Sequence, residues 1–203
     1  MAQTPPIAVL ITGRGSNFVA LADAIGRGEI PARIVLVVSN EPDAAGLAKA
    51  RRMGLATAAV PHRDFAGRRE HETAVLAALD EAGAEWVCLA GYMRLLSERF
   101  VHRYERRMLN IHPSLLPAFP GLDVQRRTLE HGVKVSGCTV HLVDAGLDSG
   151  PIVVQRSVPV LDSDDADALA ARILEQEHRA YPEALRRLLT QDWRLDGRRV
   201  VFT

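Results

Sequence analysis

Short apolar segments alternate with segments of helical periodicity through the first half of the chain, and this pattern limits the possible folds more than any other feature. The apolar segments, such as IAVLIT and ARIVLVVS, are rich in Val, Ile and Leu and lack polar alternation. Each is followed by a helical pattern, such as NFVALADAIGRG after the first. Continuous apolar strands are buried on both faces of a sheet. The sequence therefore predicts an α/β fold, Rossmann-like and doubly wound, with a mainly parallel sheet.

The second half of the chain departs from this alternation. GCTVHLVD and PIVVQRSVPV predict two consecutive strands, which we expect to be antiparallel additions to the sheet. A long helical pattern follows, opened by Ser163 and nearby aspartates and kinked or divided by Pro182. An Asp-Gly pair between two extended runs near the end of the chain predicts a β-hairpin.

No internal repeat, low-complexity linker or shift in composition divides the chain. We therefore expect a single domain over residues 1–203, with an N-terminal half to about residue 108 and a C-terminal half from about residue 109. The N-terminal segment has no basic leader, and its apolar run at residues 7–11 is too short for a signal peptide or a spanning helix. These features predict a cytoplasmic protein.

The charge of the chain is balanced, with 25 Lys and Arg against 25 Asp and Glu. A balanced charge does not indicate a nucleic-acid or membrane partner. Cys88 and Cys138 lie in apolar segments without the spacing of a metal site, so we expect buried free thiols.

A glycine-containing turn, TGRGSN, begins at Thr12 and joins the first predicted strand to the first helix. Backbone amides at such a turn can bind an anion. A dinucleotide motif would need a third glycine where Phe18 stands, and no Gly-Lys-Ser/Thr of a Walker A loop is present. Two interpretations remain: a phosphate site formed by Gly15, Ser16 and Asn17, or a plain turn in which Ser16 or Asn17 caps the helix.

Asn110 and His112 stand two positions apart in NIHPSLLP, at the end of the fifth predicted strand. Residues i and i+2 of a strand project to the same side, and ligands of open α/β sheets bind at the carboxyl ends of the strands. Pro113 and Pro117 restrict the loop that follows. An amide and an imidazolium directed at one point can stabilise negative charge on a carbonyl oxygen. The alternative is structural, with a loop histidine and a turn-forming asparagine.

The loop VDAGLDSGPIV places Asp144 and Asp148 between two predicted strands. A carboxylate from this loop near His112 would raise the pKa of the imidazole and favour its protonated form. His141 lies on the preceding strand and is either near the site or buried for structural reasons. A set of His112, His141 and Asp148 would also suit a metal hydrolase, which is a rival interpretation.

Several segments together resemble the phosphoribosylglycinamide formyltransferases, folate-dependent enzymes of purine synthesis. They are GRGSN after the first strand, LAGYMRLL at 89–96, LNIHPSLLPAFPG at 109–121, GCTVHLVDAGLDSGPI at 137–152 and EQEHRAYP at 175–182. The resemblance implies transfer of a formyl group from 10-formyltetrahydrofolate, the co-substrate, to the amine of glycinamide ribonucleotide. It implies a metal-free reaction with small-molecule substrates, no nucleic-acid or membrane partner, and a monomer or homodimer.

The resemblance also implies roles for individual residues. The catalytic residues it implies are Asn110, His112 and Asp148. The residues it implies for glycinamide ribonucleotide are Gly15, Ser16, Asn17, Pro113 and Glu177. Those for the folate are Arg68, Met93, Arg94, Leu95, Leu96 and Asn110, with the 93–96 segment acting largely through its backbone. On this basis the N-terminal half binds phosphate, and the C-terminal half carries the folate and catalytic functions.

The residue chemistry is consistent with that implied reaction. Attack of the amine on the formyl carbon creates a tetrahedral oxyanion, which Asn110 and protonated His112 could stabilise while Asp148 keeps His112 charged. The rivals are a sugar-nucleotide formyltransferase and, from a different class, a nucleotide-binding oxidoreductase. A methionyl-tRNA formyltransferase is disfavoured because the chain is short for one and lacks a basic surplus.

Overall fold

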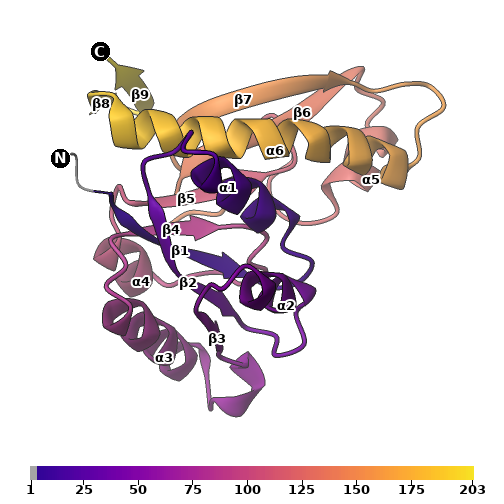
Figure 1. Cartoon of the computed structure of the whole chain (residues 1–203). Coiled ribbons are helices and arrows are strands. Elements are labelled where there is room, and N and C mark those ends of the chain that lie inside the picture. The colour runs from indigo at the N-terminus through magenta and orange to yellow at the C-terminus, as the bar shows by residue number, and fades with distance from the viewer. Residues whose placement is uncertain (1–3) are drawn as a thin grey trace. The chain divides into compact units, whose positions relative to one another are not determined.

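The computed structural model describes residues 4–203 and contains two compact units. The first unit ends at Asn110, and the second spans Ile111–Thr203 (Figure 1). Residues 1–3 lie outside the described residues, and with them the beginning of the N-terminal segment for which no leader is predicted. Among residues 4–203, no helix combines the length and the apolar character needed to cross a bilayer.

The first unit is built on parallel strands in the order β3-β2-β1-β4-β5. Their bounds are β1 Pro6–Ile11, β2 Arg33–Ser39, β3 Thr57–Ala59, β4 Trp86–Leu89 and β5 Met108–His112, and the last two residues of β5 belong to the second unit. Every residue of β1 and β4 is buried, as the continuous apolar segments predict. Each fully buried Val, Leu or Ile side chain contributes about 1.5–3 kcal/mol relative to its exposed state.

Helices of the first unit connect these strands. Their bounds are α1 Ser16–Gly26, α2 Ala45–Arg52, η1 His62–Asp64, α3 Arg68–Glu81 and α4 Glu98–Arg103. Figure 1 shows α1 with α2 on one face of the strands and α3 with α4 on the other. Connections between parallel strands are nearly always right-handed, so helices before and after a reversal of the strand order lie on opposite faces. The order reverses after β3. The carboxyl ends of β1, β2 and β4 therefore lie along one edge of the unit.

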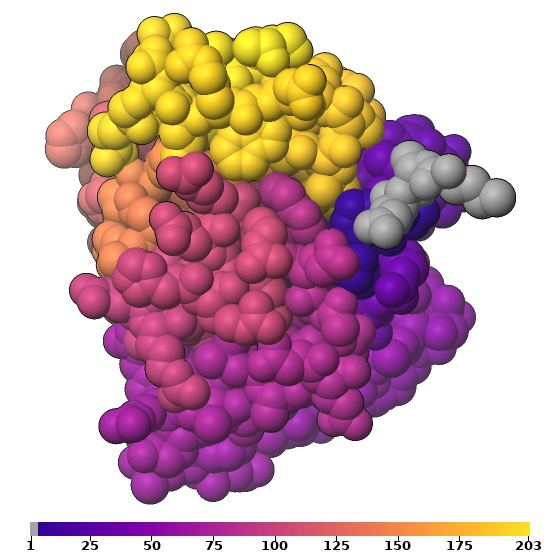
Figure 2. Space-filling model, turned by 90° about the vertical axis from the view of Figure 1, so that its left-hand side faces the viewer, coloured from indigo at the N-terminus to yellow at the C-terminus, as the bar shows by residue number. Residues whose placement is uncertain are grey.

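The second unit contains antiparallel pairs and two helices. Its strands are β6 Val135–Leu142, β7 Ile152–Pro159, β8 Trp193–Asp196 and β9 Arg199–Phe202, and its helices are α5 Val124–Glu130 and α6 Ala166–Thr190. β6 pairs with β7 and β8 with β9 in antiparallel fashion, and β9 lies parallel to the start of β7. The helix α6 packs on β6 and β7. Figure 2 shows the yellow surface of the C-terminal residues beside an orange surface from the region of β7.

The predicted fold class and the antiparallel C-terminal strands are confirmed, and so is the hairpin, whose Gly197 adopts a positive φ of 59°. One of the aspartates predicted near the start of the long helix is its N-cap: Asp165 accepts the Ala168 amide at 2.8 Å. Of the two effects predicted for Pro182, division of the helix is wrong, because Pro182 lies inside a continuous α6.

A buried apolar stripe explains why α6 continues past Pro182. Leu169, Ile173, Leu185 and Leu188 recur at helical spacing and are at most 4% exposed. Burial along the whole length of α6 offsets the single backbone hydrogen bond that a proline removes. The tertiary contacts of the helix therefore decide its length.

Candidate active site

His112 is the last residue of β5 and has hydrogen-bond acceptors at both ring nitrogens. Its Nδ1 lies 3.3 Å from Asp148 Oδ2, and its Nε2 lies 2.9 Å from the carbonyl oxygen of Phe119. The residue is 5% exposed, so water cannot easily replace these partners. An ionised carboxylate and a carbonyl can only accept. A ring that donates from both nitrogens satisfies both contacts.

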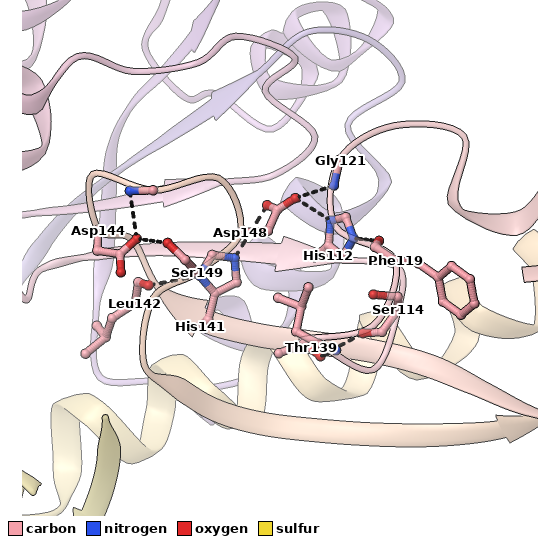
Figure 3. Close-up of polar contacts among 12 residues, drawn as sticks. His112, Ser114, Phe119, Gly121, Thr139, His141, Leu142, Asp144, Asp148 and Ser149 are labelled. Atoms are coloured by element: carbon pink, nitrogen blue, oxygen red, sulfur yellow. Dashed lines mark hydrogen bonds and ion pairs between the residues drawn. The ribbon is translucent and has the colours of Figure 1, made fainter. Parts of the chain in front are cut away.

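Asp148 is held in place by its backbone and by a third contact. Its Oδ2 also accepts the Gly121 amide at 2.8 Å, and its Oδ1 lies 3.9 Å from His141 Nε2. Figure 3 shows the Asp148 carboxylate between the two imidazole rings. The φ of Asp148 is 48°, a left-handed conformation that costs a non-glycine residue about 1–3 kcal/mol. Such strain is concentrated at functional sites, and here it directs the carboxylate to His112.

Asp144, the other acidic residue predicted in this loop, has a structural role. Its Oδ1 accepts the Gly146 amide at 3.1 Å and the Ser149 hydroxyl at 2.6 Å. A Cβ at Gly150 would lie 1.8 Å from the Leu142 carbonyl oxygen, so the loop needs glycine there. Asp144 therefore shapes the loop, and Asp148 is the carboxylate that reaches His112.

His141 is both buried and adjacent to Asp148, so the two alternatives predicted for it hold together. The β6–β7 register shifts between Val140 and His141, which moves the ring away from simple strand alternation. The Leu142 carbonyl oxygen lies 2.9 Å from its Nδ1 and accepts a hydrogen bond from it. Burial lowers the pKa of His141. Within the part of the chain that the structure describes, no group of three or more His, Cys, Asp or Glu residues is arranged to hold a metal ion.

The segment after β5 is connected to β6 and β7. The Thr139 hydroxyl donates to the Ser114 carbonyl at 2.7 Å and accepts the Leu116 amide at 3.0 Å. Gln155 donates to the Leu116 carbonyl at 2.9 Å. These contacts restrict the segment that begins at Pro113, in addition to the restriction that its prolines impose. Asn110, two residues before His112 in β5, is partly exposed.

In the glycine turn of the first unit, a glycine occupies the N-cap position of α1 and no side chain caps the helix. The N-cap of α1 is Gly15, with a φ of 65°. The alternative in which Ser16 or Asn17 caps the helix is therefore wrong. A Cβ at Gly46 would lie 2.3 Å from Ile11 Cδ1, and the Gly46 amide donates to the Gly13 carbonyl at 3.0 Å.

One charged side chain reaches this turn from α2. Lys49 Nζ donates to the Arg14 carbonyl at 2.9 Å, while the Arg14 side chain is exposed. The amides at the start of α1 therefore lie near a cation, and helix N-termini can bind anions, but the phosphate role of this turn stays a prediction.

Arg68, one of the predicted folate residues of the first unit, shares a carboxylate with Ser97, the residue that follows the 93–96 segment. Arg68 begins α3 and donates through Nε to Glu72 Oε1 at 3.0 Å, and the same oxygen accepts the Ser97 amide at 2.8 Å. Residues 93–96 lie between β4 and α4, and the side chains of Met93 and Leu95 are 63% and 64% exposed. Glu72 was not among the predicted residues, although a carboxylate four positions after an arginine on a helix is a recognisable pairing signal.

Glu177 lies on α6 in the second unit and is 8% exposed. Burial, followed by the proximity of Glu177, raises the pKa of the Cys138 thiol to about 12. Cys88 and Cys138 are both buried and free, as predicted. Glu177 is thus a buried acid within the α6–β6 packing, and its predicted substrate role stays a prediction.

The chain is similar to known proteins in both sequence and structure. A family model described as formyl transferase matches residues 6–185. Phosphoribosylglycinamide formyltransferase of Escherichia coli (strain K12) is 42% identical over 192 residues, which cover 95% of this chain and 88% of that protein. The trifunctional purine biosynthetic protein adenosine-3 of Drosophila melanogaster is 48% identical over 185 residues, which cover 90% of this chain and 14% of that protein.

The fold comparison agrees with these sequence matches. Glycinamide ribonucleotide transformylase 1 from Symbiobacterium toebii superposes with a TM-score of 0.97 at 46% identity, covering 100% of this chain and 95% of that chain. The chain thus spans nearly all of the bacterial relatives and a small part of the trifunctional one.

Proposed function

Because the chain belongs to the formyl transferase family, we propose that it transfers the formyl group of 10-formyltetrahydrofolate to the amine of glycinamide ribonucleotide. The products are formylglycinamide ribonucleotide and tetrahydrofolate, in de novo purine synthesis. The observation that carries the proposal is the buried His112–Asp148 pair at 3.3 Å, whose second ring nitrogen faces a carbonyl acceptor. A histidine fixed as a double donor is the group that a developing oxyanion needs.

The reaction proceeds by direct attack. The glycinamide nitrogen adds to the formyl carbon, and the carbonyl oxygen becomes an oxyanion. His112 Nε2 and the Asn110 amide donate to this oxyanion, and the loss of one such donor costs about 2.7–4 kcal/mol of barrier. We expect the oxyanion to replace Phe119, whose carbonyl oxygen accepts from Nε2 at 2.9 Å in this structure.

Asp148 orients His112 and stabilises its cationic form through Nδ1. In this proposal the Asp148 carboxylate also positions a water molecule. This water would carry the proton from the attacking nitrogen to the leaving nitrogen of the folate. Collapse of the intermediate breaks the bond between carbon and folate nitrogen, and no covalent intermediate with the protein forms.

The remaining site residues have binding roles in this proposal. The phosphate of glycinamide ribonucleotide binds the amides of Gly15, Ser16 and Asn17. Pro113 and Glu177 contact the rest of this substrate, with Glu177 near its amine. Arg68 and the backbone of Met93, Arg94, Leu95 and Leu96 bind the folate, together with Asn110.

The proposal includes only small-molecule substrates, needs no metal, and has the enzyme acting in the cytoplasm. Whether the chain is a monomer or a homodimer stays a prediction.

The proposal is tested by mixing the protein with 10-formyltetrahydrofolate and glycinamide ribonucleotide and following deformylated folate by absorbance. An amino-sugar nucleotide in place of glycinamide ribonucleotide tests the alternative acceptor, and a chelator tests the metal hydrolase. With 10-formyltetrahydrofolate present, we expect turnover with glycinamide ribonucleotide as the acceptor and none with the amino-sugar nucleotide. The chelator should leave this turnover unchanged. The absence of turnover under conditions in which the Escherichia coli enzyme works would refute the assignment.

A further inference from the structure

Glu72 is a buried carboxylate that makes three hydrogen bonds within the first unit. It is 5% exposed on α3. Its Oε1 accepts Arg68 Nε at 3.0 Å and the Ser97 amide at 2.8 Å, and its Oε2 accepts the Ser97 hydroxyl. A buried carboxylate is stable only when its oxygens are paired in this way. Glu72 therefore fixes the residue that directly follows the 93–96 segment.

The start of the 93–96 segment is fixed by a second contact. The Met93 amide donates to the Thr12 hydroxyl at 2.9 Å, and that hydroxyl donates to Asn40 Oδ1 at 2.6 Å. The Thr12 amide donates to the Gly91 carbonyl at 3.1 Å. The segment is thus held at both ends by buried or partly buried polar groups, while two of its side chains are exposed.

This arrangement suits a backbone binding site. A segment that recognises a flat heterocycle through its amides and carbonyls must hold them in position before the ligand arrives, because ordering a mobile loop weakens binding. The same carboxylate also orients the Arg68 guanidinium, because Nε donates to Glu72 while the Arg68 side chain is 46% exposed.

We propose that Glu72 is a positioning residue for the folate, one that sets the backbone of residues 93–96 and the Arg68 guanidinium in their binding arrangement. This inference rests on the proposed function, in which those groups bind 10-formyltetrahydrofolate. Glu72 acts through Ser97 and Arg68 and does not touch the ligand itself.

A purely structural role would be to join α3 to α4, and the chain offers a matched control for it. Asp80 of α3 forms an ion pair with Arg103 at the end of α4, with 2.6 Å between Oδ1 and Nη2. Asp80→Asn removes a carboxylate link between the same two helices but leaves the 93–96 segment untouched. Glu72→Gln keeps an acceptor for the Ser97 amide and is the conservative variant.

The test measures KM for each substrate in wild type, Glu72→Ala, Glu72→Gln and Asp80→Asn. For Glu72→Ala we expect KM for the folate to rise roughly tenfold or more, with KM for glycinamide ribonucleotide within about twofold of wild type. Glu72→Gln should give an intermediate value, and Asp80→Asn should match wild type. Equal rises in both KM values, or none, would overturn the proposal.

A second measurement is independent of turnover and covers the case in which Glu72→Ala does not fold. Hydrogen exchange of the ligand-free protein should be faster at residues 93–97 in Glu72→Gln than in wild type or Asp80→Asn. Unchanged exchange there would refute the positioning role even if the enzyme is active. If wild type shows no formyl transfer but Glu72→Gln still exchanges faster at residues 93–97, the proposed function is refuted, while the positioning of this segment by Glu72 is supported.

Discussion

Replacement of Asp148 by asparagine tests the catalytic pair most sharply. The side chains of His112 and Asp148 are 6% and 11% exposed, so solvent screens their 3.3 Å contact little. Asparagine has the same shape, and its amide oxygen can still accept from both His112 and Gly121, but it carries no charge. A hydrogen bond between charged groups contributes about 1.5–3 kcal/mol. If that stabilisation is lost in the transition state, kcat falls about 10- to 150-fold.

The assay is steady-state turnover with both substrates saturating, alongside a thermal melt to show that the variant is folded. Asp144→Asn is the matched control, because Asp144 lies in the same loop but binds Gly146 and Ser149. The control should lose loop stability and retain most of its kcat. An Asp148→Asn enzyme with kcat within about twofold of wild type would refute the role assigned to the pair.

Three further predictions follow from packing and burial. Gly46→Ala should lower the unfolding free energy by about 1–3 kcal/mol, because the new Cβ would lie 2.3 Å from Ile11 Cδ1. The same change should raise KM for glycinamide ribonucleotide. A melting temperature and a KM equal to those of wild type would contradict this prediction. Burial lowers the pKa of His71, His141 and His178. As pH falls through 6.5, the unfolded chain therefore binds more protons than the folded chain does. The unfolding free energy from urea melts should be smaller at pH 5.5 than at pH 7.5. A replacement of His141 should reduce this slope. The Cys138 thiol, with a pKa raised to about 12, should resist alkylation at pH 8 until the protein is denatured, and rapid labelling of the native protein would count against its burial.

The sequence predicts well those features that depend on local patterns. The apolar run of β1 implies burial on both faces, and every residue from Pro6 to Ile11 is buried. Asn110 and His112 share a strand because their spacing and the strand pattern are local, and β5 contains both. The hairpin of β8 and β9 follows from one Asp-Gly pair.

Features that depend on contacts distant in sequence could not be predicted in the same way. Pro182 is compatible with a continuous α6 only because β6 and β7 bury the helix along its length. The choice of Asp148 over Asp144 as the partner of His112 follows from the left-handed backbone at Asp148, which no residue pattern indicates. Glu72 has a visible local partner in Arg68, but its contact with Ser97 spans 25 positions and needs the folded chain.

Structural features support the proposed substrate residues. The turn proposed for the phosphate has a left-handed N-cap at Gly15, and the Lys49 ammonium donates to its Arg14 carbonyl. The segment proposed for the folate, residues 93–96, has exposed side chains and fixed ends. Glu177, proposed for the substrate amine, is buried on α6.

The most direct test of the account is formylglycinamide ribonucleotide production, measured by mass spectrometry, in wild type and in His112→Ala under identical conditions. Wild type should form the product, and the variant should form it slower by at least about two orders of magnitude while its circular dichroism stays native. A folded His112→Ala protein that makes the product at close to the wild-type rate would contradict the claim that this histidine stabilises the oxyanion.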